Sequence, residues 1–144
     1  MALGEDHLLE IGNLEAARDW GFAGDYVEGM WRMVQAETPE DYVLATGRAH
    51  TVRQLIDTAA ASVGIAIDWQ GEGQGTEGRD RRTGRLMVRV DPSFYRPADI
   101  NLTVGNPAKA AGGLGWQASL GFEALIAMMI EADMKRLKTG QMIL

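Results

Sequence analysis

Short strand-like runs that alternate with amphipathic helical patterns are the feature that most limits how this sequence can fold. Apolar runs or alternation predict short strands at residues 8–11, 41–47, 65–69 and 86–90. Apolar residues three and four positions apart predict helices between and after these strands. Three or four short strands separated by helices indicate an α/β fold, or the related α+β arrangement.

The first predicted helix has one apolar face. Asp25 is a possible N-cap, and apolar residues follow it at positions i, i+3, i+4 and i+7, namely Val27, Met30, Trp31 and Val34. The sequence therefore predicts that this face is buried and that the helix ends near Thr38 and Pro39.

Three further helices have recognisable ends. Thr51 and Gln54 have the spacing of a capping box, and Gly64 should end the helix that they open. Asn106 and Pro107 predict a brief helix that is cut off by Gly112 and Gly113. Ser119 should cap a terminal helix that continues to about Leu137, with an apolar stripe of Phe122, Leu125, Ile126, Met129 and Ile130.

Length and composition exclude several classes of protein. The 144 residues are the size of one ordinary domain, and the absence of cysteine excludes disulfides, thiol nucleophiles and thiolate metal sites. No apolar run approaches the roughly 20 residues of a membrane span, and the N-terminus does not resemble a signal peptide, so we expect a cytoplasmic protein. His7 and His50 are far apart, so no metal site is expected.

Charge is distributed unevenly along the chain. The net charge of −6 argues against a nucleic-acid partner, but residues 79–96 hold six arginines against two aspartates, a local charge of +4. This stretch suits a compact anion such as a phosphate-bearing small molecule. A solvated basic loop explains the same charge equally well.

Gly73, Gly75 and Gly78 have the GxGxxG spacing of a dinucleotide-binding fingerprint. A working fingerprint opens a helix, whose first backbone amides face the pyrophosphate. The residues that follow here, "RDRRTGRLMVRVD", lack apolar residues at helical spacing and contain another glycine, Gly84. The pattern therefore predicts a mobile, hairpin-like loop, not a cofactor site.

Two arginines are candidates for binding phosphate. Arg18 offers a planar guanidinium beside the apolar wall of Trp20, although a surface ion pair with Asp19 or Asp25 is an alternative. Arg96 precedes a proline, and Asp99 follows three residues later. An arginine for phosphate and a carboxylate for sugar hydroxyls are the groups that a sugar nucleotide requires.

Five blocks of the sequence together resemble one enzyme family. These are "EIGNLEAARDWGFAGDYVEGMWRMVQ", "DYVLATGRAHTVRQLI", "DPSFYRPADI", "NPAKAAGGLGW" and "FEALIAMMIEAD". From about Ala2 to Lys138 their order and spacing resemble the second half of the GDP-mannose 4,6-dehydratases, a family of extended short-chain dehydrogenases/reductases. The resemblance implies a complete enzyme in which an N-terminal Rossmann domain holds NADP and a smaller C-terminal region closes over the sugar nucleotide. Such an enzyme converts GDP-mannose to GDP-4-keto-6-deoxymannose.

The resemblance also implies roles for particular residues. Arg18 and Arg96 would hold the GDP diphosphate, and Asp99 would bind the ribose hydroxyls. The family usually has glutamate at the position of Asp99, so the shorter side chain has less reach here. Gly12 and Asn13 would line the nucleotide.

The catalytic Tyr and Lys of the family, four residues apart, have no counterpart here. Tyr26, Tyr42 and Tyr95 are followed at that spacing by Met30, Thr46 and Asp99. We therefore expect residues 1–144 to form a single substrate-binding region, truncated at its N-terminus, with no catalytic residues and no cofactor site of its own.

The sequence leaves several interpretations of the partners and the activity open. The expected partners are GDP-mannose or GDP, and a Rossmann domain supplied in cis or in trans, with homo-oligomers possible. Neither a nucleic acid nor a membrane is expected as a partner. The chain alone should be inactive. The alternatives are a non-catalytic interaction or structural module, in which exposed apolar surface mediates association, and a half-enzyme completed by a separate cofactor-binding chain.

Overall fold

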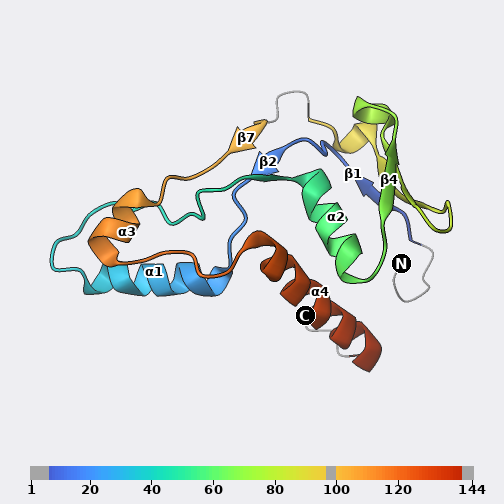
Figure 1. Ribbon diagram of the computed structural model, residues 1–144. Coiled ribbons are helices and arrows are strands. Elements are labelled where there is room, and N and C mark those ends of the chain that lie inside the picture. Colours follow the sequence, from blue (N-terminus) through green and yellow to red (C-terminus); the bar gives the residue numbers. More distant parts are fainter. Residues whose placement is uncertain (1–6, 97–99, 141–144) are drawn as a thin grey trace.

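Two small sheets and two pairs of helices make up the computed structural model, which describes residues 7–96 and 100–140, and the larger sheet lies at the end opposite to the first and third helices (Figure 1). The larger sheet has the strand order β1-β6-β5-β4 and comprises β1 (Leu9–Ile11), β4 (Ile67–Gln70), β5 (Glu77–Asp80) and β6 (Leu86–Val90). Strand β1 is parallel to β6, and the other pairs are antiparallel. The smaller sheet has the order β3-β2-β7 and comprises β2 (Ala17–Arg18), β3 (His50–Thr51) and β7 (Leu102–Thr103).

The helices are arranged at two places along the molecule. Helices α1 (Ala23–Gln35) and α3 (Ala108–Leu114) lie together at the end away from the larger sheet (Figure 1). Helices α2 (Val52–Ser62) and α4 (Phe122–Thr139) pack against each other near that sheet. Two short 3-10 turns complete the fold, η1 (Gly73–Gly75) and η2 (Pro92–Phe94). None of the described helices is long and apolar enough to cross a membrane.

The main hydrophobic core lies where α2 meets the larger sheet. Its buried members come from the loop after β1, from α2 and from β6, and they are Leu14, Ile56, Met87, Val88 and Val90. A second packing centre lies at the opposite end of the molecule, beside α1. There Trp116 is 1% exposed and donates its indole N–H to the carbonyl oxygen of Asp25 at 2.7 Å.

The mixed α/β fold predicted from the sequence is confirmed, and three of its four strands are present as β1, β4 and β6. The strand predicted at residues 41–47 is wrong. Those residues are irregular, because the backbone N–H groups of Thr46 and Gly47 donate to the carboxylate of Asp19 instead of to a neighbouring strand. Strand β5 was not predicted, since its sequence "EGRD" lacks apolar alternation.

The predicted helix ends are confirmed in part. Thr51 and Gln54 form the expected capping box, with Gln54 N–H donating to the Thr51 hydroxyl at 3.1 Å. Gly64 follows α2 with φ +75°. Helix α3 continues through Gly112 and Gly113 to Leu114, and Gly115 follows it as the C-cap with φ +60°. The residue that caps α4 is Gly121, because the hydroxyl of Ser119 is bound to Asp25.

The predicted buried face of α1 is wrong. Val27, Met30, Trp31 and Val34 do share one face of the helix, but they are 64%, 57%, 63% and 79% exposed. The side that packs on the rest of the chain contains Asp25 and Gly29, both buried. Asp25 therefore lies within the helix and is not its N-cap, which is Phe22.

Candidate functional site

The two phosphate-binding candidates come from segments that the smaller sheet joins. Strand β2, which contains Arg18, is parallel to β7, and Ala17 N–H donates to the carbonyl of Asn101 at 2.8 Å. Arg18 Nη1 donates to the carbonyl oxygen of Ile100 at 2.6 Å and to that of Ala17 at 2.9 Å. The guanidinium is thus fixed against the segment that begins four residues after Arg96.

Gly12 and Asn13 lie at the same corner of the fold. The Asp91 N–H donates to the carbonyl of Ile11 at 2.9 Å, which places the end of β1 beside η2. At Gly12 the two backbones are so close that a side chain would overlap the carbonyl group of Phe94. Glycine is therefore required for this close approach.

Arg96 extends from this corner into solvent. Its side chain is exposed and makes no hydrogen bond or ion pair with the described residues. An unengaged guanidinium is available to form a bidentate contact with a phosphate. Asp99, the proposed ribose ligand, lies outside the described residues.

A pocket of about 320 Å³, with both polar and apolar groups in its lining, connects these segments. It is lined by residues of four separate parts of the chain, Asn13, Leu14, Glu15, Arg53, Gly73, Thr76, Tyr95 and Asn101. Asn13 Oδ1 accepts from the Glu15 N–H at 2.9 Å. Amide, hydroxyl and charged groups of this kind can bind the edge of a base or the hydroxyls of a sugar.

Some lining residues of this pocket were not singled out from the sequence. Tyr95 belongs to the block "DPSFYRPADI" and Asn101 follows it directly, so their closeness to Arg96 in sequence is a usable signal. Arg53 gave no such signal, because α2 brings it to the pocket from a distant part of the chain. Its guanidinium pairs with Glu15 at 2.5 Å and lies 4.6 Å from the ring centre of Trp69.

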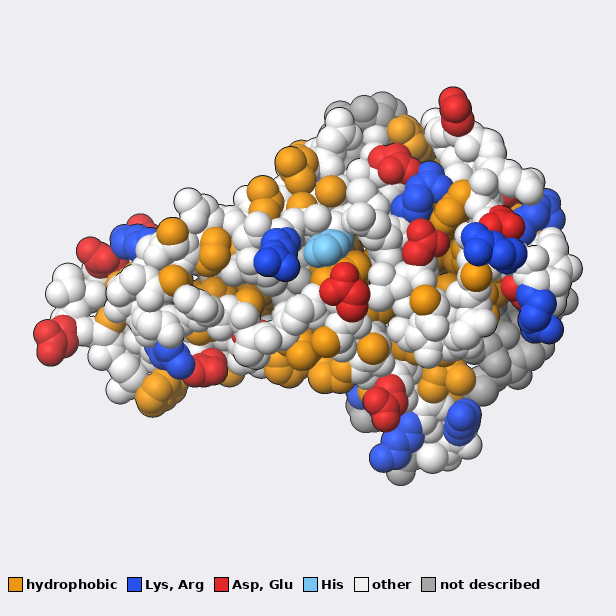
Figure 2. Space-filling model, in the orientation of Figure 1, with side chains coloured by type: hydrophobic (Ala, Val, Ile, Leu, Met, Phe, Trp, Pro, Cys, Tyr) orange, Lys and Arg blue, Asp and Glu red, His pale blue; other side chains and the backbone are white. Residues whose placement is uncertain are grey.

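The basic stretch at residues 79–96 is largely neutralised within the hairpins of the larger sheet. Arg79 pairs with Glu77 at 2.7 Å, Arg81 pairs with Asp68 at 2.8 Å, and Arg89 pairs with Glu10. Basic and acidic side chains accordingly alternate over the sheet end of the surface (Figure 2). For Arg79, Arg81 and Arg89 this arrangement favours a solvated basic loop over an anion site.

Asp19 and Asp25 serve the fold. The Asp19 carboxylate accepts from the Thr46 hydroxyl at 2.6 Å and from the backbone N–H groups of Thr46, Gly47 and Gly105. Burial opposes the charge of Asp19, but these hydrogen bonds outweigh it and hold its pKa below the ordinary value. The pKa of Asp25 is lowered in the same way, with burial outweighed by hydrogen bonds from Ser119 and Leu120.

Trp20 lines a different hollow from the one at Asn13. Its indole N–H donates to the carbonyl of His50 at 3.3 Å, and both residues line a polar pocket of about 360 Å³ beside the start of α4. The His50 ring stacks on Phe122 with their centres 3.9 Å apart. Trp20 therefore offers its apolar ring to this pocket and not to the pocket at Asn13.

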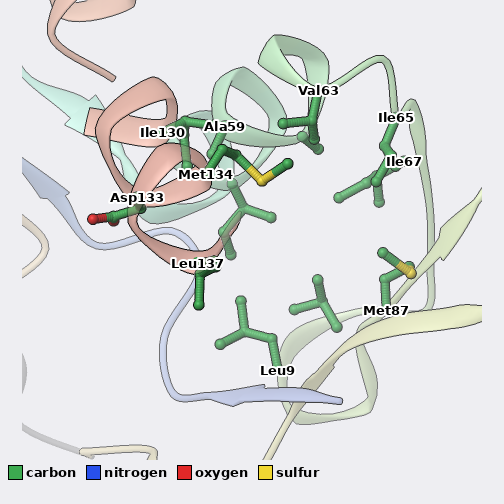
Figure 3. Close-up of a pocket in the computed structure, with 13 residues that line it drawn as sticks. Leu9, Ala59, Val63, Ile65, Ile67, Met87, Ile130, Asp133, Met134 and Leu137 are labelled. Atoms are coloured by element: carbon green, nitrogen blue, oxygen red, sulfur yellow. The ribbon is translucent and has the colours of Figure 1, made fainter. Parts of the chain in front are cut away.

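A third hollow, of about 240 Å³, lies between α2, α4 and the larger sheet. Figure 3 shows that side chains such as Leu9, Ile67, Met87 and Leu137 surround it. Asp133 is the only charged residue among its described lining residues. Because phosphates require charged or hydrogen-bonding donors, this hollow does not suit a nucleotide.

The glycine-rich stretch does not fit a dinucleotide. Gly73–Gly75 form the 3-10 turn η1 in the loop between the antiparallel strands β4 and β5, and β5 follows directly where a fingerprint would open a helix. Without a helix N-terminus at that point, no row of backbone amides faces a pyrophosphate. The predicted hairpin-like connection is confirmed for Gly73 and Gly75, but Gly78 lies in strand β5 and not in a loop.

Comparison with known sequences identifies relatives over nearly the whole chain. The family model described as "GDP-mannose 4,6 dehydratase" matches residues 1–129. A GDP-mannose 4,6 dehydratase of Dictyostelium discoideum is 43% identical over 140 residues, which are 97% of this chain and 39% of the relative. A Homo sapiens relative of the same name is 39% identical over 96% of this chain and 37% of its own length. The chain thus spans about two-fifths of these relatives.

Solved structures share the fold at low sequence identity. A UDP-glucose 4-epimerase from Bifidobacterium longum, solved with NAD+ and UDP, has a TM-score of 0.69 and is 20% identical, over 94% of this chain and 37% of the epimerase. The protein RMD from Pseudomonas aeruginosa, solved with NADPH, has a TM-score of 0.67 and is 17% identical, over 89% of this chain and 36% of that protein.

Proposed function

Because the chain belongs to the GDP-mannose 4,6-dehydratase family, we propose that it forms the part of such an enzyme that binds the nucleotide sugar. The activity of the complete enzyme is the conversion of GDP-mannose to GDP-4-keto-6-deoxymannose. The observation that carries the proposal is the hydrogen bond from Arg18 to the carbonyl of Ile100. It joins the two sequence blocks that supply the candidate phosphate ligands.

The candidate residues that the structure describes have roles that their positions support, and the role of Asp99 rests on the family resemblance alone. Arg18 and Arg96 hold the diphosphate, because one guanidinium is fixed by backbone carbonyls while the other is exposed and unengaged. Asp99 binds the ribose hydroxyls. Gly12 and Asn13 line the nucleoside, with Asn13 at the pocket that also contains Tyr95 and Asn101.

The cofactor of the complete enzyme is NADP, which accepts and returns the hydride of the reaction when bound. The described residues at the GxGxxG spacing form a 3-10 turn followed by a strand, so they do not fit a dinucleotide. The role of this chain is therefore to bind and orient GDP-mannose. The cofactor and the Tyr-Lys pair come from the remaining part of the enzyme, in cis or in trans.

Calorimetric titration of GDP into the purified chain tests the site. We expect saturable binding that Arg96→Ala weakens at least about tenfold, since a lost charge-assisted contact is worth roughly 1.5–3 kcal/mol. Arg81→Ala is the matched control, because Arg81 is also exposed but lies on the hairpin and is paired with Asp68. Absence of binding, or equal weakening by both substitutions, contradicts the proposed site.

A second assay tests whether the chain acts alone. We expect no product from GDP-mannose and added NADP, because none of the three tyrosines is followed by lysine at the required spacing. Mass spectrometry of the nucleotide sugar measures the product directly. Formation of the 4-keto-6-deoxy product by the isolated chain contradicts the proposal.

A further inference from the structure

An ion pair in the wall of the pocket at Asn13 is fixed before any ligand binds. Arg53 Nε and Nη2 both donate to one carboxylate oxygen, Glu15 Oε1, at 2.8 Å and 2.5 Å. The guanidinium also lies 4.6 Å from the ring centre of Trp69, whose indole N–H donates to Asp57 at 2.9 Å. A ligand that contacts this pair therefore does not have to order it first, which favours binding.

Two polar atoms of the pair have no partner among the described residues. Glu15 Oε2 accepts no hydrogen bond there and Arg53 Nη1 donates none, although both side chains line the pocket. The side chain of Glu15 is 64% exposed and that of Arg53 is 27% exposed, so a ligand can reach both. The pair thus offers one acceptor and one donor to a molecule in the pocket.

Hydrogen bonds place this pocket beside the candidate phosphate ligands. Asn101 lines the pocket, and the carbonyl of the residue before it, Ile100, accepts from Arg18 Nη1 at 2.6 Å. Tyr95, which is bonded to Arg96 through the backbone, lines the pocket as well. A nucleotide whose diphosphate lies on the two arginines therefore has its base within reach of the pocket.

The size and the apolar part of the pocket suit a base. Its volume of about 320 Å³ is within the roughly 300–1,000 Å³ that is usual for small-ligand sites. Leu14 and the ring of Tyr95 provide apolar and aromatic surface in the lining, on which the flat face of a base can pack. The polar edge of the base is then left to meet the charged pair.

Guanine is the base whose edge matches this pair. Its O6 accepts hydrogen bonds, whereas its N1–H and its N2 amino group donate them. A carboxylate only accepts and a guanidinium only donates, so Glu15 Oε2 suits the two donors and Arg53 Nη1 suits O6. Adenine has an amino donor in place of O6, and uracil has a carbonyl oxygen in place of the N2 amino group, which a carboxylate repels.

We propose that Glu15, positioned by Arg53, selects the base of the nucleotide sugar by accepting hydrogen bonds from the N1–H and the N2 amino group of guanine. The inference rests on the proposed function, and it adds the residues that make the site specific for a guanine nucleotide.

Calorimetric titration of the purified chain with GDP, inosine diphosphate (IDP) and UDP tests the proposal. The base of IDP keeps O6 and N1–H but lacks the N2 amino group. We expect GDP to bind at least about tenfold more tightly than IDP, because IDP lacks a hydrogen bond to a charged acceptor. UDP should also bind at least about tenfold more weakly than GDP. Equal affinity for GDP and either of the other nucleotides overturns the proposal.

Glu15→Gln identifies the residue that reads the base. The amide oxygen can still accept from Arg53, but the amide N–H groups then face the donors of guanine. We expect GDP to bind at least about tenfold more weakly and its preference over IDP to fall below about threefold. An unchanged preference overturns the proposal.

Glu28→Gln is the matched control. Glu28 also accepts from Nε and Nη2 of an arginine, Arg32, but it does not line the pocket. This variant should keep the preference of the parent chain, and an equal loss in both variants overturns the proposal. Exposed ion pairs contribute little to stability, so both variants should fold, which thermal unfolding checks. Glu15→Ala is a second variant that should lose the same preference.

The same titrations separate this inference from the proposed function. GDP binding that Arg96→Ala weakens, but without preference over IDP, rejects only the selection of the base by Glu15. A preference for GDP that Glu15→Gln removes while Arg96→Ala leaves the affinity unchanged supports the inference and rejects the phosphate role of Arg96. Absence of binding for all three nucleotides rejects both.

Discussion

The carboxylate of Asp25 accepts a hydrogen bond of 2.7 Å from the hydroxyl of Ser119 and another of 2.9 Å from its backbone N–H. The Leu120 N–H adds a third at 3.3 Å. Asp25 is 6% exposed, and a buried charge is tolerated only when such donors replace water. These contacts join the first turn of α1 to the segment that leads into α4, 94 residues further along.

Asp25→Ala should therefore destabilise the protein strongly. The substitution removes the acceptor of three part-buried hydrogen bonds from Ser119 and Leu120, and we expect the free energy of unfolding to fall by about 2–4 kcal/mol. Urea unfolding measures the change. Asp133→Ala is the control, because its exposed ion pair with Arg136 should be worth less than about 0.5 kcal/mol. Similar losses for the two variants would contradict the anchoring role of Asp25.

Stability should fall in acid because of Asp19 and Asp25. Both have folded-state pKa values below the ordinary 3.8, so their contribution is complete above that pH. As the pH falls below 3.8, the unfolded chain takes up protons first, and the stabilisation is lost progressively until the folded-state pKa is passed. Urea unfolding at several acid pH values measures this slope. A variant with Asp19→Asn and Asp25→Asn should have a shallower slope than one with Asp133→Asn, and identical slopes would exclude these groups.

Gly29→Leu should separate α1 from the residues beneath it. The new side chain has no space beside Leu44 and Trp116, and overpacking of this kind costs about 1–3 kcal/mol. Gly112→Leu is the matched control within helix α3, where no atom would lie within 4 Å of an added Cβ. That variant should be as stable as the parent or more stable, by up to about 1 kcal/mol, because leucine favours helix more than glycine does. Thermal unfolding distinguishes them, and a stable Gly29→Leu protein would refute the close packing.

Arg18 and Arg96 should differ in what their loss affects. Arg18→Ala removes hydrogen bonds to the carbonyls of Ala17 and Ile100, so we expect both weaker GDP binding and a lower melting temperature. Arg96→Ala should weaken binding with no change in melting temperature, because its side chain has no partner among the described residues. Calorimetry paired with thermal unfolding measures both quantities. A drop in melting temperature for Arg96→Ala would show that this side chain serves the fold.

The start of α2 was predicted correctly from a local signal. The capping box of Thr51 and Gln54 is made by residues three apart, so no distant partner is needed for it to form. The irregular conformation of residues 41–47 could not be predicted in this way. Its backbone donors are taken by Asp19, a residue more than 20 positions earlier, and only the tertiary fold brings the two together.

Periodicity identified the residues that share a face of α1, but it does not say what covers that face. The spacing of the hydrophobic residues is the same whether this face of α1 packs against the same chain or against another part of a larger protein. The inner face could not be found from apolar spacing, since it depends on a glycine and a charged aspartate. The candidate site was predicted through the family resemblance. The pairing of β2 with β7 that unites it comes from residues 17 and 102, far apart in sequence.

The parallel pairing of β1 with β6 has a consequence for the order in which the protein can assemble. Leu9 is in register with Val88, so the first strand has no neighbour until some 80 further residues have been synthesised. Likewise β2 must wait for β7 to complete its parallel pair. Closing such long loops costs entropy before any contact repays it, which slows folding. The first strand therefore joins the larger sheet late, after the residues of β6 have been synthesised, whereas β2 has an earlier neighbour in β3.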